Sequence, residues 1–474
     1  MTWDAVVVGA GPNGLAAAVE LARHGCTVLV REASSEVGGA ARTAEITLPG
    51  FRHDLGSAVH PLGVGSPFFR SLPLERYGLE WVHPELPLAH PLEGGAAVTV
   101  ERDVHATARG LGRDGPAYRR LVEPFVGRWP GFVHQVLDTP LRWPRDPVLH
   151  ARFGLRALRS ARSLATRYLR TPEARALLAG NAAHSALPLD QVPSGAVALV
   201  LLVAAHAVGW PSPRGGAGAL TRALAEHLRS LGGTVETDAP VSSLDDVPAA
   251  RAILLDLTPR QVVGVAGSRL PDRYRRRLEA YTYGPGAFKV DWALDGPVPW
   301  TADACRRAGT VHVCGAFEEV VSSEASVADG WAPRRPFVIL AQPTVHDPTR
   351  APPGKHVAWA YCHVPNGSAA DMTERIEAQV ERFAPGFGAR ILARATHRPA
   401  DLEAWNANLV GGDVNAGLLS LRQTLARPVL STRPWATPAR DLYLCSAATP
   451  PYGGVHGMCG YHAARTALKR TFGR

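Results

Sequence analysis

Asp4-Ala-Val-Val-Val-Gly9-Ala-Gly11-Pro-Asn-Gly14-Leu-Ala-Ala-Ala18 is an apolar run that passes through three glycines into a second apolar run. This pattern predicts a buried strand, a tight turn and a helix, the GxGxxG arrangement of a dinucleotide-binding unit. Gly9 permits the turn, Gly11 lets the backbone approach a pyrophosphate, and Gly14 lets the helix pack on the strand. The phosphates then meet the N–H groups of the helix N-terminus. The sequence therefore predicts a dinucleotide-binding site at the start of the chain.

An acidic residue at the expected distance supports this interpretation. A second apolar strand, Thr27-Val-Leu-Val30, leads to Glu32. In dinucleotide-binding units an acid about 20 residues beyond the glycines binds the ribose hydroxyls. The next stretch carries a glycine pair, an arginine and an Asp–Gly segment: Gly38, Gly39, Arg42, Asp54 and Gly56. A plain NAD-binding unit would continue into a third βα repeat instead, so the pattern favours FAD.

Residues 37–57 resemble the extended FAD fingerprint of the flavin amine oxidase and phytoene desaturase superfamily. In that superfamily the double glycine and the arginine lie along the phosphate and flavin side of the cofactor. The resemblance implies that this stretch, with Gly38, Gly39, Arg42, Asp54 and Gly56, belongs to an FAD site.

The C-terminal region carries a second resemblance. Residues 442–464 combine an apolar strand, the turn Gly453-Gly454-Val455-His456-Gly457 and a helix of small residues. This looks like the C-terminal flavin-binding motif of phytoene dehydrogenase-like proteins, a family that includes bacterial carotenoid desaturases and pyridine nucleotide-disulfide oxidoreductase domain 2 proteins. There the helix that begins near Gly457 directs its amides toward the pyrimidine edge of the flavin. The resemblance implies that Gly454, Val455 and Gly457 contact FAD.

The resemblance covers nearly the whole chain and predicts its organisation. Residues 210–241 are similar to the middle segment of the FAD domain, in which Val241 would contact the adenine through its backbone. Residues 287–294 and 401–406 resemble elements of the substrate domain. We therefore expect an α/β fold in which a Rossmann-type, glutathione reductase-like FAD-binding domain is interleaved with an α+β substrate domain. The predicted domains are residues 1–75, 205–265 and 405–474 for FAD, and 76–204 and 266–404 for the substrate.

The net charge of +9 comes from 51 Lys and Arg against 42 Asp and Glu, but no nucleic-acid-reading motif accompanies it. Many arginines gather in residues 142–170, where Arg152, Arg156, Arg159 and Arg162 recur at helical spacing beside leucines. A basic amphipathic helix at a membrane surface and a solvated arginine face both fit this pattern. The apolar run from Ser194 to His206 is too short to span a membrane and predicts a buried helix or tunnel wall.

Cysteine and histidine usage indicates the compartment and excludes a metal site. The six cysteines show no CxxC spacing, which is typical of a reduced, cytoplasmic protein without disulfides or a metal site. The 18 histidines show no HExxH-like spacing. We expect a cytoplasmic flavoprotein that touches the membrane only peripherally, if at all.

Lysine is nearly absent from the chain, which makes one lysine informative. It occurs at Lys289, Lys355 and Lys469, and Lys289 alone lies inside an apolar strand. Arginine cannot easily replace a lysine whose ammonium must be compact or deprotonated. In the amine oxidase branch a lysine on a similar strand holds a water against flavin N5, so the resemblance makes Lys289 a catalytic candidate. A structural lysine paired with Asp291 or Asp295 is the alternative.

Further catalytic candidates are four histidines and one tyrosine. A histidine could act as a general base, because imidazole titrates near neutrality. They are His60, His184, His456, His462 and Tyr452, of which His456 and Tyr452 belong to the predicted flavin-side turn. A dedicated base is not required if hydride leaves to flavin N5.

The resemblance implies an FAD-dependent dehydrogenase or desaturase that oxidises a lipophilic or secondary-metabolite substrate by hydride transfer to flavin N5. Oxygen or a quinone would accept the electrons. Amine oxidase-like C–N oxidation is an alternative, although Val455 stands where that branch has an aromatic residue unless Tyr452 supplies it. A flavin isomerase without net redox change and a lipid carrier are further alternatives, and the complete fingerprint at Gly9, Gly11, Gly14 and Glu32 argues against the carrier.

Overall fold

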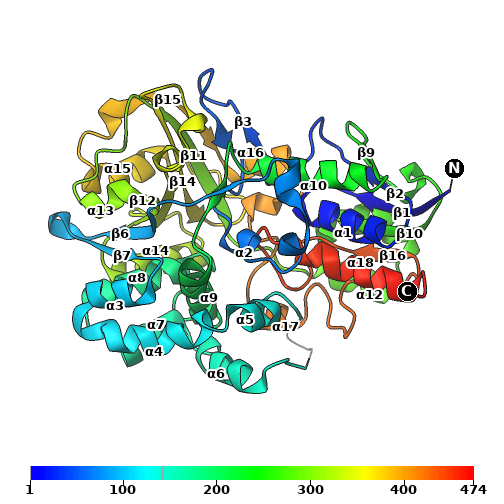
Figure 1. The fold of residues 1–474 in the computed structure, drawn as a ribbon, viewed down its shortest axis with the longest axis horizontal. Coiled ribbons are helices and arrows are strands. Elements are labelled where there is room, and N and C mark those ends of the chain that lie inside the picture. Colours follow the sequence, from blue (N-terminus) through cyan, green and yellow to red (C-terminus); the bar gives the residue numbers. More distant parts are fainter. Residues whose placement is uncertain (1, 140–142) are drawn as a thin grey trace.

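The computed structural model describes residues 2–139 and 143–474. Its strands form two main sheets at different ends of the molecule (Figure 1). The smaller sheet is wholly parallel, in the order β16-β10-β1-β2-β9. Its strands are β1 (Trp3–Val8), β2 (Val28–Arg31), β9 (Thr234–Glu236), β10 (Ala250–Leu255) and β16 (Leu442–Leu444). The predicted α/β fold with a Rossmann-like sheet is confirmed.

Helices cover both faces of the parallel sheet because its strands are apolar on both sides. Val7 packs toward a core shared with α1 (Pro12–Arg23), α10 (Gly218–Ser230) and α18 (Met458–Arg470), whereas Val8 joins a second core with α11 (Pro259–Ala266) and α12 (Asp272–Glu279). Figure 1 shows α10, α1 and α18 together over this end of the molecule.

The larger sheet has the order β15-β11-β14-β13-β12-β6-β7. It is antiparallel except for the parallel pair β6 and β12. Its strands are β6 (Leu86–Pro91), β7 (Ala97–Val100), β11 (Gly286–Leu294), β12 (Ala308–Val313), β13 (Val338–Ala341), β14 (His356–Val364) and β15 (Ile391–His397). The five strands of the smaller sheet and the seven of the larger one fall in the segments predicted for the FAD and substrate domains, respectively; the domain boundaries themselves stay predictions.

The alternation of side chains along β11 determines which residues lie on each face of the larger sheet. Phe288, Val290 and Trp292 point into a core with α13 (Asp303–Arg307) and α15 (Thr373–Phe383). Because successive side chains alternate between faces, the intervening residues of β11, including Lys289 and Asp291, face the opposite side. This opposite face looks toward the parallel sheet.

A helical region lies beside the larger sheet (Figure 1). It contains α3 (Val104–Gly110), α4 (Gly115–Val126), α5 (Trp129–Val136), α6 (Pro147–Ala157), α7 (Ala161–Tyr168), α8 (Pro172–Ala183), α9 (Ser194–Ala207) and α14 (Phe317–Ala328). The apolar run predicted to be buried is α9, which packs against α4, α5, α6, α7 and α8. Within the part of the chain that the structure describes, no helix combines the length and apolar character needed to cross a bilayer.

The arginine-rich stretch forms two helices rather than one continuous amphipathic helix. Ser160 accepts a hydrogen bond from the Ser163 amide and begins α7, so the pattern that runs through Arg152 and Arg162 is broken between them. Side-chain capping of this kind lets a helix start where sequence spacing alone predicts continuation. Leu155 is consequently exposed on α6, whereas Leu164 is buried on α7.

Shorter elements connect these parts. They are β3 (Thr43–Ala44), β4 (His53–Asp54), α2 (Pro61–Val64), β5 (Trp81–Val82), β8 (Ser212–Pro213), α16 (Pro399–Trp405) and α17 (Leu421–Leu425). The β3–β4 hairpin follows the predicted glycine pair, and α16 carries part of the predicted substrate-domain motif.

Close backbone packing joins the two ends of the chain around α1. A Cβ atom on Gly14 would lie 2.0 Å from the carbonyl oxygen of Gly9, which lets α1 pack directly on the end of β1. On the other side of α1, a Cβ atom on Gly460 in α18 would lie 1.8 Å from the carbonyl oxygen of Asn13. Because neither Gly14 nor Gly460 has a side chain, α1 lies directly on the end of β1 and α18 lies directly on α1. The C-terminal helix therefore reaches the glycine-rich turn that follows β1.

We expect Gly460→Ala to lower the free energy of unfolding by about 1–3 kcal/mol, because the added methyl group must push α18 away from α1. Thermal unfolding monitored by circular dichroism measures the change. Gly264→Ala on α11 is the matched control, since nothing lies within 4 Å of its Cβ position, and alanine is the better helix former. Equal midpoints for the two variants would contradict this account of the packing.

Candidate functional site

A cavity of about 520 Å³ lies between the two sheets. Its lining comes from the glycine-rich turn after β1, from the facing surface of β11, β13 and β14, and from the C-terminal turn before α18. Of the predicted cofactor residues, the structure places these in the lining: Gly9, Gly11, Glu32, Gly39, Arg42, Gly56, Val241, Gly454 and Val455. Of the predicted catalytic residues, His60, His184 and Lys289 line it. The tertiary structure thus gathers segments that are hundreds of residues apart.

Glycine contacts leave room for a ligand at the parallel-sheet end of the cavity. A Cβ atom on Gly39 would lie 3.1 Å from the Cα atom of Gly11, so the two predicted glycine motifs pack face to face. The guanidinium of Arg42 lies over the ring of Trp405, 4.9 Å from its centre, and its buried Nε atom has no hydrogen-bond partner. Partial burial lowers the pKa of Arg42, yet its charge remains available to an anion.

Glu32 lies at the same end, directly after β2. Its carboxylate accepts hydrogen bonds from the amides of Ala10 (2.7 Å) and Ser34 (2.9 Å). The side chain is buried against protein but lines the cavity. Two backbone donors therefore fix the orientation of this acid beside Val241, which also lines the cavity.

Four predicted cofactor residues lie behind the cavity wall rather than in it. Gly14 packs α1 on β1, Gly38 adopts a φ of 136° in the turn before Arg42, and Gly457 packs against Phe69. Asp54 is fully buried, where its carboxylate accepts hydrogen bonds from Arg350, Thr43 and Ala217. These residues shape the site from outside its lining.

The C-terminal turn places its side chains in two directions. Val455 lines the cavity. Tyr452, with a φ of 87°, points away, and its hydroxyl donates to the carbonyl of Thr424. His456 is buried: Nε2 lies 3.1 Å from the Tyr452 carbonyl, and Nδ1 accepts from the Met458 amide, which caps the start of α18. Burial lowers the pKa of His456 to about 4, so this ring is neutral and engaged by the backbone.

Lys289 has features of both roles considered from the sequence, the catalytic and the structural one. It lines the cavity, and it also forms an ion pair with Asp291. Its ammonium forms a buried ion pair with Asp291 on the same face of β11 and lies 5.2 Å from the centre of the Trp359 ring. Burial would raise the pKa of Asp291, but Lys289 and His53 hold it below its usual value. Asp295 pairs with the exposed Lys355 instead.

The part of the cavity beside the larger sheet is mostly apolar and aromatic. Trp359 and Tyr361 stack along β14 with ring centres 6.0 Å apart. The remaining lining here includes Val59, Leu201, Trp210, Ile339 and Ala341. The sequence analysis did not single out the β14 aromatic residues; their spacing of two within an apolar run was the available signal.

Histidines form the polar wall of this compartment. His184 Nε2 lies 2.9 Å from His312 Nε2, and burial lowers the pKa of His184 to about 3. Burial also lowers the pKa of His60 to about 4, while its Nε2 atom lies 3.1 Å from the Ser57 hydroxyl. Neutral rings of this kind suit an uncharged substrate. His462 lies on α18 and is not part of the lining.

Asp256 is a cavity residue that the sequence analysis missed, although an acid at the end of an apolar strand was the signal. It follows β10 and accepts a hydrogen bond from the Gly14 amide at 2.8 Å, in the first turn of α1. Burial raises the pKa of Asp256 to about 7, the nearby Glu32 charge adds to this, and the hydrogen bond opposes it. The carboxyl group thus changes charge near neutrality at the helix N-terminus.

Because the pKa of Asp256 is about 7 in the folded state and near 3.8 unfolded, the folded protein retains a proton that the unfolded chain releases between these values. The stability that the protonated Asp256 contributes is therefore lost as pH rises toward 7. We expect Asp256→Asn to unfold at a higher temperature than the wild type above about pH 7, with the difference shrinking toward about pH 4. Midpoints measured across this range test the prediction; parallel profiles would contradict it.

Comparisons with known proteins agree with the geometry. Residues 7–72 match the NAD(P)-binding Rossmann-like domain. The mouse (Mus musculus) pyridine nucleotide-disulfide oxidoreductase domain-containing protein 2 is 26% identical, covering 98% of this chain and 93% of that protein. Phytoene dehydrogenase of Streptomyces griseus is 26% identical, covering 85% and 82%. An oxidoreductase structure from Methanosarcina mazei superimposes with a TM-score of 0.67 at 17% identity, covering 98% and 99%. The chain is thus an oxidoreductase, homologous to the phytoene dehydrogenase and pyridine nucleotide-disulfide oxidoreductase domain-containing proteins, with a Rossmann-like dinucleotide-binding domain.

Proposed function

We propose that this oxidoreductase is an FAD-dependent dehydrogenase of the desaturase type, which oxidises a lipophilic small molecule. The observation that carries the proposal is the continuity of one cavity from the glycine-rich turn and Glu32 to an aromatic compartment beside Lys289. One end suits a dinucleotide and the other suits an apolar substrate, so a cofactor and a substrate can meet inside the protein.

The residues at the parallel-sheet end fit FAD. The Gly11–Gly39 contact leaves a wall without side chains, against which a pyrophosphate can lie. Arg42 offers an unpartnered buried Nε atom to an anion. Glu32 would bind ribose hydroxyls, and the backbone of Val241 would contact adenine. The matched domain model describes NAD(P) binding, whereas the turn at Gly454 and Val455 extends the same cavity beyond a mononucleotide unit.

Bound FAD would supply a hydride acceptor, and the protein supplies the environment. Val59, Leu201 and Ile339 exclude water and hold the apolar substrate. Trp359 and Tyr361 offer flat aromatic surfaces against which an unsaturated chain or ring can stack. Lys289 provides one positive charge at this wall, held in place by Asp291. Oxygen or a quinone would regenerate the oxidised enzyme.

The C-terminal turn favours this reaction over amine oxidation. An amine site needs an aromatic residue beside the flavin to hold the substrate nitrogen. Val455 occupies the lining at this turn, and Tyr452 is turned away toward Thr424. We therefore propose oxidation of a C–C bond.

The direct test is an absorption spectrum of the purified protein between about 300 and 550 nm, the region in which flavins absorb. The spectrum is repeated without oxygen after adding lipophilic polyenes, sterols or terpenes. Bleaching by one compound, with loss of two hydrogens from its mass, supports the proposal. Bleaching by amines alone, conversion at unchanged mass, or a colourless protein that binds NAD but not FAD would each replace it by another function.

Glu32→Gln should weaken FAD binding by about tenfold or more, because a carboxylate acceptor for two hydroxyls becomes a neutral amide. Fluorescence titration of the deflavinated protein with FAD measures the dissociation constant. Glu36→Ala is the matched control, since this acid lies four residues away and is exposed. Unchanged affinity in Glu32→Gln would remove Glu32 from the ribose role.

Lys289→Met should slow substrate turnover by about tenfold or more while FAD remains bound, because the cavity loses its positioned charge. The variant leaves Asp291 without its ion-pair partner, so Lys289→Met/Asp291→Asn, which removes both charges, is measured beside it. Lys355→Met removes the exposed lysine that pairs with Asp295 and should leave turnover unchanged. Anaerobic flavin reduction rates report the effect. Wild-type rates in both Lys289 variants would assign this lysine to structure alone.

A further inference from the structure

Four large apolar side chains stand in solvent on or beside α6. The exposed fractions are 84% for Trp143, 73% for Val148, 75% for Leu155 and 64% for Leu158. All four lie within one short stretch of the chain, whereas the opposite face of α6 carries the buried Leu149. Exposed apolar side chains that gather in this way mark a surface that contacts another apolar phase.

Arginines are frequent in the sequence around these apolar residues. From Trp143 to Arg170 the sequence contains seven arginines and one acid, Asp146. Asp146 is engaged with Arg128, 3.4 Å away. Arg145 and Arg152 are exposed and form no ion pair with the residues that the structure describes. This surface therefore carries uncompensated positive charge beside its apolar residues.

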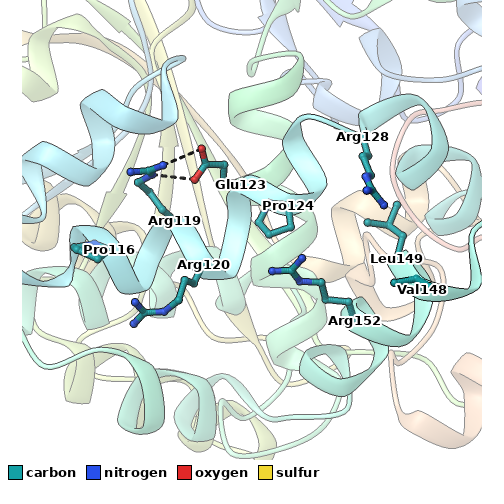
Figure 2. A pocket seen from close by; sticks show the side chains of 9 residues that line it. All are labelled: Pro116, Arg119, Arg120, Glu123, Pro124, Arg128, Val148, Leu149 and Arg152. Carbon is teal, nitrogen blue, oxygen red and sulfur yellow. Dashed lines mark hydrogen bonds and ion pairs between the residues drawn. The ribbon is translucent and has the colours of Figure 1, made fainter.

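A basic hollow opens next to the apolar residues. It has a volume of about 550 Å³ and lies between α4 and α6 (Figure 2). Its charged lining is Arg119, Arg120, Glu123, Arg128 and Arg152. Arg119 is paired with Glu123 at 2.9 Å, while Val148 belongs both to the hollow and to the exposed apolar set. The guanidinium groups suit phosphate oxygens, which they can bind in bidentate fashion.

We propose that the α4–α6 face, defined by Trp143, Val148, Leu155, Leu158, Arg145 and the arginines of the hollow, docks on an anionic phospholipid bilayer. The apolar side chains enter the interfacial layer, where tryptophan is favoured, and the arginines bind lipid phosphates. Each basic residue near an anionic surface adds attraction, so the two features act together. A bilayer fits better than a protein partner, because the surface combines scattered apolar side chains with a net positive charge. Its two acids, Glu123 and Asp146, are already paired with Arg119 and Arg128.

The α4–α6 face lies next to the helix that lines the cavity, so docking could assist substrate entry. Helices α4 and α6 both pack on α9, and Leu201 of α9 lines the cavity. The docking face therefore covers the helix that forms one wall of the substrate compartment. A lipophilic substrate held in the bilayer would begin close to that wall. This use rests on the proposed function, whereas docking itself does not.

Vesicle flotation tests docking with the purified full chain. We expect the protein to float with phosphatidylglycerol vesicles and not with phosphatidylcholine vesicles, and to be released by about 1 M salt. Trp143→Ser/Leu155→Ser/Leu158→Ser should reduce partitioning about tenfold or more, and Arg145→Glu/Arg152→Glu should do the same. An unchanged midpoint of thermal unfolding shows that the variants fold.

Matched control variants distinguish binding through this face from non-specific adsorption to vesicles. Trp331→Ser removes another exposed tryptophan, 73% accessible, and Arg273→Glu/Arg276→Glu reverses two exposed charges on α12. Both should partition like the wild type. Absence of binding to phosphatidylglycerol, equal losses in controls and α4–α6 variants, or a change of oligomeric mass in place of vesicle binding would overturn the proposal. No substrate enters these measurements, so their failure leaves the proposed function standing, and failure of flavin bleaching leaves docking standing.

Discussion

Backbone contact around α1 is the constraint on which the site depends. Gly14 lets this helix rest on the end of β1, and Gly460 lets α18 rest on α1 from the other side. These contacts bring the C-terminal turn with Val455 to the same cavity as Gly11. A side chain at either glycine would separate elements whose mutual approach creates the wall, because a packed interior has little room to adjust.

Buried charges then fix the two sheets relative to each other. Asp54, on the hairpin that follows the dinucleotide motif, forms a fully buried ion pair with Arg350, which lies between β13 and β14. A backbone hydrogen bond joins the same two segments, because the Arg52 amide donates to the Arg350 carbonyl at 2.8 Å. Losing one member would leave a charge buried without compensation, so the pair links the dinucleotide-motif segment specifically to the larger sheet.

The cavity divides its electrostatic tasks along its length. Arg42 and Glu32 provide ionic and hydrogen-bonding groups at the dinucleotide end, and Asp256 adds a carboxyl group that titrates near neutrality. At the other end, burial keeps His60 and His184 neutral, and the Lys289 charge is balanced by Asp291. One enclosure thus offers polar surroundings at one end and apolar surroundings at the other, which suit the proposed cofactor and substrate. The proposed docking of the α4–α6 face would bring this enclosure close to substrates dissolved in lipid.

Local patterns determined the parts of this protein that depend on neighbours in sequence. The glycine spacing from Gly9 to Gly14 and the apolar strands around it required a parallel sheet with a helix on it, since only glycine permits such close approach. The apolar run from Ser194 likewise required a buried helix. Tertiary structure decided what depends on distant residues: that Asp291 rather than Asp295 pairs with Lys289, that Asp256 reaches the α1 N-terminus, and that Tyr452 turns away while Val455 faces the cavity. Burial, pairing and side-chain direction arise where separate segments meet, so no pattern within one segment contains them.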